Sequence, residues 1–174
     1  MRLRQPGRTV ADGRLDIGLS RLLPQDGQTE VQALSLGEER LVAAVSSDSP
    51  LANQAEVSLA QLSGYPLILF PADYGSGLNQ SIEQLYRHKG LPLRAGPSGR
   101  QITSIIALVA AGQGVALVPE CTQSLMNKGV TYRPLVDAEA YARLLVLTRS
   151  GASSLMVTAF LTVIDELLQA RQKA

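Results

Sequence analysis

Hydrophobic residues along the chain occur in two spacings that follow one another. Short apolar runs bounded by glycine, proline or serine are typical of β-strands, whereas apolar residues three and four positions apart are typical of amphipathic helices. We expect strands at 14–19, 41–45, 66–70, 115–118, 130–135 and 143–148. We expect helices at 57–62, from 78 to the glycine at 90, from 102 to the glycine at 112, at 120–127 and at 157–168. This alternation predicts an α/β protein.

Three of these patterns also predict which side chains are buried. In the first strand, Leu15, Ile17 and Leu19 lie two positions apart and share one face. The run at 41–45 is apolar at every position, which indicates a strand covered on both faces. The last helix, with Ser153 or Ser154 available as its N-cap, carries one apolar stripe. The stripe comprises Val157, Phe160, Leu161, Ile164, Leu167 and Leu168.

Composition narrows the possible classes of protein. A chain of 174 residues, 45% hydrophobic and 18% charged, is long enough for one domain or two small lobes that need no disulfide or metal for stability. A net charge of +1 gives no electrostatic reason to bind nucleic acid. One histidine and one cysteine cannot build a zinc site, an iron–sulfur cluster or a disulfide within the chain, so we expect no metal and no cofactor.

Targeting signals are not evident in the sequence. The basic start at 1–8 is not followed by an apolar stretch of signal-peptide length, and the longest apolar run, 105–112, is too short to span a bilayer. We therefore expect a cytoplasmic protein without a membrane anchor.

The residues that catalysis would need are scarce. His88 lies between Arg87 and Lys89 at an expected helix end, where a solvated cation is the simpler interpretation. Cys121 has no evident partner base, so we interpret it as a small apolar side chain. We expect no enzymatic activity.

Two other motifs also have ordinary structural explanations. The glycines of Gly112-Gln113-Gly114 follow a helix and precede a strand, which is the reverse of the dinucleotide-binding order. The neighbouring carboxylates at 38–39, at 137 and 139, and at 165–166 are interpreted as solvated surface charges.

The segment Gly75-Ser76-Gly77-Leu78-Asn79 is the strongest candidate for chemistry. It opens a helix directly after an apolar strand, and the first N–H groups of a helix can bind a carboxylate. Ordinary capping of the helix by Ser76 or Asn79 explains the same residues equally well. Arg21, just past the first strand, is a second candidate partner for an anion.

The order of several motifs resembles the effector-binding domain of LysR-type transcriptional regulators. The most specific is the run Leu-Val-Ala-Ala-Gly-Gln-Gly-Val-Ala-Leu-Val-Pro at 108–119. The other matching segments are 13–19, 39–45, 49–52, 57–62, 66–71 and 132–135, followed by the last helix. The resemblance covers essentially the whole chain, and the segments 118–124 and 132–135 look closest to regulators of aromatic-acid degradation.

This resemblance implies a two-lobe fold of the type 2 periplasmic-binding-protein kind, joined by two crossing strands. Residues 1–38 and 144–174 would form lobe I and residues 39–143 lobe II, with a small effector in the cleft between the lobes. Lobe I would lack its first strand and helix. The family's effector contacts carry over to Ser20, Arg21, Ser76, Gly77, Leu78, Asn79 and Leu144. In this scheme Ser76 and Asn79 donate hydrogen bonds, the amides of Gly77 and Leu78 bind a carboxylate, and Leu144 packs on the carbon skeleton.

The leading functional hypothesis is therefore an effector-sensing domain that forms a homodimer or tetramer. It would contact DNA only through a domain that these residues do not include. The alternative is a solute-binding protein of the same fold that serves a transporter.

Overall fold

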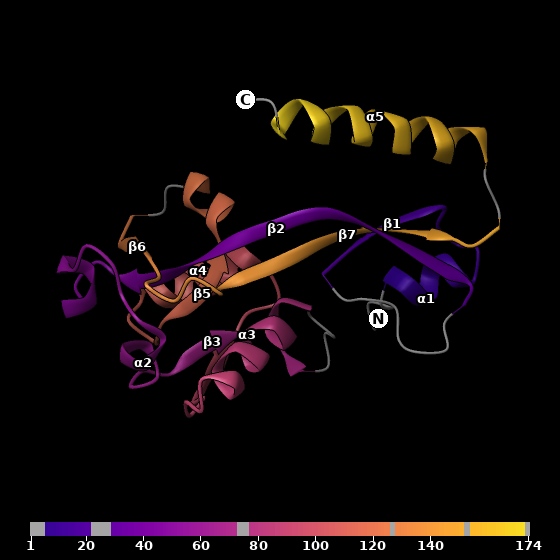
Figure 1. Cartoon of the computed structure of the whole chain (residues 1–174). Coiled ribbons are helices and arrows are strands. Elements are labelled where there is room, and N and C mark those ends of the chain that lie inside the picture. Colours follow the sequence, from indigo (N-terminus) through magenta and orange to yellow (C-terminus); the bar gives the residue numbers. More distant parts are fainter. Residues whose placement is uncertain (1–5, 22–28, 73–76, 126–127, 152–153, 173–174) are drawn as a thin grey trace. The chain divides into compact units, whose positions relative to one another are not determined.

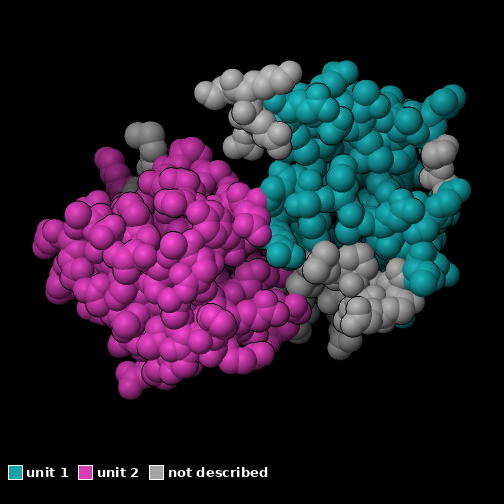
Figure 2. Space-filling view, in the orientation of Figure 1, with its two compact units in different colours: residues 1–37, 143–174 teal, residues 38–142 magenta. Residues whose placement is uncertain are grey.

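The computed structural model describes residues 6–21, 29–72, 77–125, 128–151 and 154–172. The chain divides into two compact units, residues 1–37 with 143–174 (unit 1) and residues 38–142 (unit 2), which Figure 2 shows in teal and magenta. Two long strands, β2 (Val31–Ser46) and β7 (Tyr141–Arg149), contain the points at which the chain passes from one unit to the other. Each unit is described by itself below, with the elements labelled in Figure 1.

Unit 1 contains α1 (Pro6–Ala11), β1 (Ile17–Ser20), the first part of β2, most of β7 and α5 (Leu155–Gln172). Strand β1 pairs antiparallel with β7, with Ser20 opposite Leu145. Helix α1 packs against β1 at Gly18, where a Cβ atom would lie 3.2 Å from side-chain atoms of Pro6 and Val10. The described core of this unit is small, and its buried members are Val10, Val31, Leu145 and Leu147.

The prediction that Leu15, Ile17 and Leu19 form the buried face of the first strand is wrong. Leu15 precedes the observed strand and is 45% exposed, and Leu19 within the strand is 59% exposed. The buried position of β1 is Gly18 instead, because a residue without a side chain allows α1 to approach the strand closely. A pattern based on apolar side chains cannot detect a buried face that carries a glycine.

Unit 2 is built around a sheet covered on both faces. Within it β2 pairs antiparallel with β5 (Ala116–Pro119) on one side and with β6 (Val130–Pro134) on the other. Strand β3 (Leu67–Leu69) pairs parallel with β4 (Ala95–Ser98), and a parallel bridge joins Leu67 to Val115. Leu41, Ala43 and Val45 enter one core cluster and Val42 and Ala44 the other, which confirms the expected strand buried on both faces.

Helices cover the two faces of this sheet. Helix α2 (Leu59–Leu62) and α3 (Gly77–His88) contribute buried residues to the first cluster, and α4 (Ile102–Ala110) contributes to the second. The short helices η1 (Pro50–Asn53) and η3 (Glu120–Leu125) are of the 3-10 type, so the helix expected at 120–127 is a 3-10 turn over its described part.

Helix α5 differs from the expected pattern of burial. Of the six residues of the expected stripe only Val157 is buried, whereas Phe160 and Leu167 are 44% and 61% exposed. Leu161, Ile164 and Leu168 are partly buried. Ser154 accepts a hydrogen bond from the amide of Met156 at 3.3 Å, in agreement with its expected role as N-cap, while Ser153 lies outside the described residues.

Among the described residues, no helix combines the length and the apolar character needed to cross a bilayer.

Candidate functional site

The first part of the candidate site lies in unit 2, where α3 begins after the buried strand β3. The inner face of α3 packs into the first core cluster through Leu78, Ile82, Leu85 and Tyr86, all less than 10% exposed. Glycine is tolerated at the first helical position, and Gly77 starts the helix here. The packed face therefore fixes the direction of the helix relative to β3.

Asn79 makes the most specific polar contact of this region. Its Oδ1 atom accepts a hydrogen bond from the amide of Phe70 at 3.2 Å, and its Nδ2 atom donates to the carbonyl of Phe70 at 2.9 Å. Asn79 is only 7% exposed. The first turn of α3 is thus joined to the residue that directly follows β3.

Leu78 and Gly77 can offer only main-chain groups to a ligand at the candidate site. The Leu78 side chain is buried in the core, so only its backbone amide is suited to contact a ligand. The Ser81 hydroxyl donates to the carbonyl of Gly77 at 3.1 Å, within the first turn of α3. The first amides of a helix have no acceptor within the helix and carry partial positive charge, which suits a carboxylate. Ser76 lies outside the described residues.

The second part of the candidate site lies in unit 1. Ser20 ends β1 opposite Leu145 of β7, which places Arg21 and Leu144 beside it at the same end of the strand pair. The guanidinium of Arg21 donates to the carbonyl of Arg143 at 3.5 Å. Because neighbouring residues of a strand point to opposite faces, Leu144 points away from the core that contains Leu145.

The structure therefore brings the expected site residues together in two groups. Gly77, Leu78 and Asn79 lie together in unit 2. Ser20, Arg21 and Leu144 lie together in unit 1. The unit 2 group offers backbone amides, and the unit 1 group combines polar side chains with the apolar Leu144, which together is the composition expected for binding a small organic anion.

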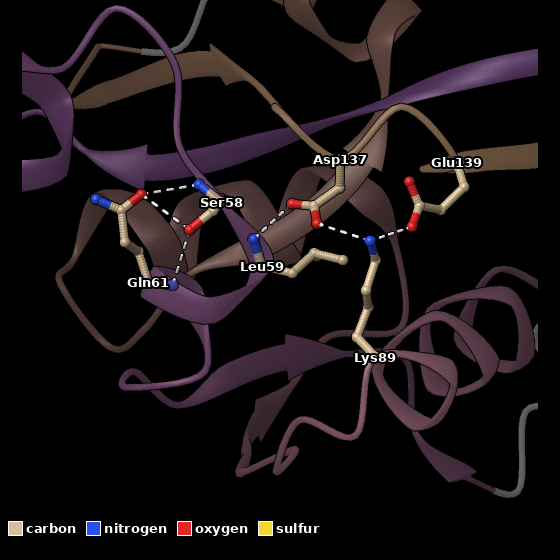
Figure 3. Close-up of polar contacts among 6 residues, drawn as sticks. All are labelled: Ser58, Leu59, Gln61, Lys89, Asp137 and Glu139. Carbon is tan, nitrogen blue, oxygen red and sulfur yellow. Dashed lines mark hydrogen bonds and ion pairs between the residues drawn. The ribbon is translucent and has the colours of Figure 1, made fainter.

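A second polar cluster, shown in Figure 3, was not anticipated from the sequence. The carboxylate of Asp137 accepts a hydrogen bond from the amide of Leu59 at 2.8 Å and lies 3.5 Å from the ammonium of Lys89. Lys89 also forms an ion pair with Glu139. Ser58 and Gln61 form a capping box at the start of α2.

This cluster corrects the interpretation of Asp137 as a solvated surface charge, because its side chain is only 13% exposed. Asp137 sits at the N-terminus of α2, where a negative charge is stabilised by the helix dipole and by the amide of Leu59. The cluster joins the start of α2, the residue after α3 and the segment between β6 and β7.

Protonation in this cluster follows from its contacts. The hydrogen bond with Glu139 raises the pKa of Lys89, and the same bond lowers the pKa of Glu139. Burial raises the pKa of Tyr86 to about 12, and the nearby charge of Asp137 adds to this effect. The Tyr86 hydroxyl is buried without a hydrogen-bond partner among the described residues. Tyr86 is therefore neutral at all physiological pH values.

We next locate the residues that the sequence offered for catalysis or cofactor binding. His88 ends α3. Cys121 is exposed in η3, so its interpretation as a small apolar side chain that fills the core is wrong. Gly112 and Gly114 have φ angles of +70° and +151°, and a Cβ atom at Gly114 would lie 2.3 Å from the carbonyl oxygen of Pro66. These glycines are needed for the turn from α4 into the following strand. The described part of the chain contains no group of three potential metal ligands.

Comparison with known proteins identifies the family to which this chain belongs. The model of the LysR substrate binding domain matches residues 4–169, so the chain belongs to this family. The expected resemblance and the expected type 2 periplasmic-binding-protein-like fold are both confirmed. The match supports the transcriptional-regulator interpretation over that of a solute-binding protein of a transporter.

Among its relatives is the HTH-type transcriptional regulator CatR of Pseudomonas putida, 32% identical over 90% of this chain and 53% of CatR. Another is the HTH-type transcriptional regulator BenM of Acinetobacter baylyi, 29% identical over 83% of this chain and 48% of BenM. The chain thus spans about half the length of these relatives.

A solved structure, the BenM effector binding domain with its effector benzoate, superposes with a TM-score of 0.84 at 25% identity. This match covers 100% of this chain and 78% of the BenM domain. The expectation that lobe I lacks its first strand and helix stays a prediction.

Proposed function

We propose that this chain is the effector-sensing part of a regulator that responds to a small carboxylate, with aromatic acids as the first class to test. The observation that carries the proposal is membership in the LysR substrate-binding family, together with the benzoate bound by the similar BenM domain. The chemistry of the α3 start supports a carboxylate, because helix N-termini bind anions through their backbone amides.

The two groups of residues have different roles in this proposal. In unit 2 the hydroxyl of Ser76 and the amides of Gly77 and Leu78 bind the carboxylate. In unit 1, Ser20 and Arg21 contribute polar contacts and Leu144 packs on the carbon skeleton of the effector. In this proposal the two compact units act as the two lobes implied by the family resemblance.

The proposal has consequences for the longer regulator. An effector shifts the arrangement of the lobes only by its difference in affinity for the two states. In the parent regulator this shift is transmitted to a DNA-binding domain outside these residues, in a homodimer or tetramer in the cytoplasm. No catalytic step is part of this function.

The first test is a thermal-unfolding titration with benzoate. Because a ligand that binds only the folded state stabilises it, benzoate at a hundred times its Kd adds about 2.7 kcal/mol. For a chain of this size, that stabilisation corresponds to a rise in Tm of about 5–10 °C. Benzyl alcohol, which keeps the ring but has no carboxylate, is expected to give no rise.

Pairs of matched variants test whether Ser76 and Arg21 contact the effector. Ser76→Ala and Arg21→Met are expected to reduce the rise in Tm with benzoate. Ser104→Ala and Arg14→Met make the same changes at exposed positions and are expected to keep the full rise. A full rise in both Ser76→Ala and Arg21→Met would contradict the assigned contacts.

A further inference from the structure

We infer that Asn79 is a positioning residue, which places the first amides of α3 through its contacts with Phe70. The inference rests on the proposed effector site at the start of α3. It gives Asn79 a role besides the direct hydrogen bond to the ligand that the sequence led us to expect.

The first argument is the geometry of the Asn79 amide. Its carbonyl oxygen accepts from the Phe70 amide at 3.2 Å, and its nitrogen donates to the Phe70 carbonyl at 2.9 Å. Both polar atoms of the side chain therefore engage one backbone residue. This arrangement reproduces the paired donor and acceptor that a neighbouring strand would offer.

The second argument is the position of Phe70 in the sheet. Strand β3 ends at Leu69, whose carbonyl still accepts a hydrogen bond from Gly99 at 3.1 Å. Phe70 is the next residue, and its amide and carbonyl bind the Asn79 side chain. Asn79 thus extends the hydrogen bonding of β3 by one residue and attaches α3 to that point.

The third argument is burial. Asn79 is 7% exposed and lies next to Leu78, which is 6% exposed and packs into the core. A buried amide that loses its partners is costly, because its polar groups have already been removed from water. The contact with Phe70 is therefore strong enough to fix the first turn of α3, and with it the amides of Gly77 and Leu78.

These arguments predict a local change when the Asn79 amide is altered. Asn79→Asp keeps the size of the side chain and the acceptor for the Phe70 amide, but it places a carboxylate oxygen against the Phe70 carbonyl. Asn79→Ala removes both hydrogen bonds. Each change is expected to loosen the attachment of α3 to β3 even when no ligand is present.

The test is amide hydrogen exchange of the ligand-free protein, read at Phe70 and at residues 81–83, whose amides are the first in α3 with acceptors inside the helix. Protection there is expected to fall about ten- to a hundredfold in Asn79→Ala and Asn79→Asp, while α4 keeps its protection. Gln80→Glu is the matched control, since it makes the same amide-to-carboxylate change at the neighbouring exposed position. If Asn79→Ala unfolds the whole chain, Asn79→Asp is the variant to compare.

Wild-type protection at Phe70 and residues 81–83 in both Asn79 variants would overturn the inference. Because this measurement needs no ligand, its outcome is independent of whether benzoate binds. A titration of the wild-type chain with benzoate tests the proposed function separately. If benzoate binds and the inference holds, its affinity falls in Asn79→Asp but not in Gln80→Glu.

Discussion

At the scale of single residues, a few polar side chains fix where the elements of unit 2 begin. Asn79 joins the start of α3 to Phe70, and Asp137 accepts a hydrogen bond from Leu59 at the start of α2. Both side chains are largely buried, so the loss of either leaves backbone groups without partners. The Asn79 contact thereby holds the start of α3, and the Asp137 contact holds the start of α2.

The sequence identifies such residues only in part. Asn79 follows a glycine-rich segment, so its presence near a helix start could be predicted, but its partner Phe70 is nine positions earlier and depends on how β3 ends. Asp137 contacts Leu59 across 78 positions, and no local pattern signals a contact of this kind. The sequence shows which hydrogen bonds a side chain can make, but only the folded structure shows which residue is its partner.

The ion pair of Lys89 and Glu139 predicts a defined dependence of stability on pH. The pKa of Glu139 is lowered from its ordinary value of 4.5, so its contribution is present above that pH and is lost as the pH falls through the lowered value. The pKa of Lys89 is raised from 10.5, so its contribution is present below that pH and is lost as the pH rises through the raised value. The window of stabilisation therefore spans the pH range between these values.

Lys89→Met is expected to lower the midpoint of chemical denaturation slightly at pH 7, since the pair is largely exposed. The difference from wild type should decrease as the pH falls through the lowered pKa of Glu139. Lys128→Met makes the same change at another exposed lysine of unit 2 and serves as the control. A difference between Lys89→Met and wild type that stays constant down to pH 2 would contradict the role of Glu139.

At the scale of elements, apolar periodicity predicts the buried strands and helices of unit 2 well. Strand β2 is the instructive exception, since the sequence predicts only 41–45 and the strand runs from Val31 to Ser46. Its first part is largely exposed and includes the charged residues Glu38, Glu39 and Arg40. Gly37 lies within it at φ +120°. A strand without a buried face has no apolar pattern to detect.

Short elements built from small residues are missed for a related reason. Strand β4 has the sequence Ala-Gly-Pro-Ser and pairs parallel with β3. A Cβ atom at Gly96 would lie 3.0 Å from the Pro66 side chain, so close approach of backbones defines this element. Helix α1 has six residues and one buried side chain, Val10, which is too little for a periodic signal.

Two residues of the apolar stripe of helix α5 are expected to contribute differently to stability. Val157 is 7% exposed, and Val157→Ala should reduce the free energy of unfolding by about 2 kcal/mol through lost burial and a cavity. Phe160 is 44% exposed, and Phe160→Ala should cost about 1 kcal/mol or less although it removes more atoms. Chemical denaturation followed by circular dichroism compares the two.

A larger loss for Phe160→Ala than for Val157→Ala would contradict this account. It would mean that the Phe160 side chain is covered in solution, for instance by another copy of the chain.

At the scale of the whole molecule, the sequence predicts the fold and the family correctly, whereas its prediction of the site residues remains untested. The motifs along the chain point to the LysR effector-binding domain, and the family match and the similarity to the BenM domain confirm it. The net charge of +1 gives this chain no electrostatic reason to bind nucleic acid. The assignment of effector contacts remains a proposal, because the chemistry of the ligand determines which hydrogen-bond donors of the protein it uses.

The most direct test of the central claim is a nuclear magnetic resonance titration of the wild-type chain with benzoate. The account predicts saturable shifts of the backbone amide resonances of Gly77 and Leu78, together with those of Ser20 and Arg21. Benzyl alcohol at the same concentrations should leave these resonances unchanged. Saturable binding of benzoate that leaves the Gly77 and Leu78 amides unshifted would contradict a carboxylate site at the start of α3.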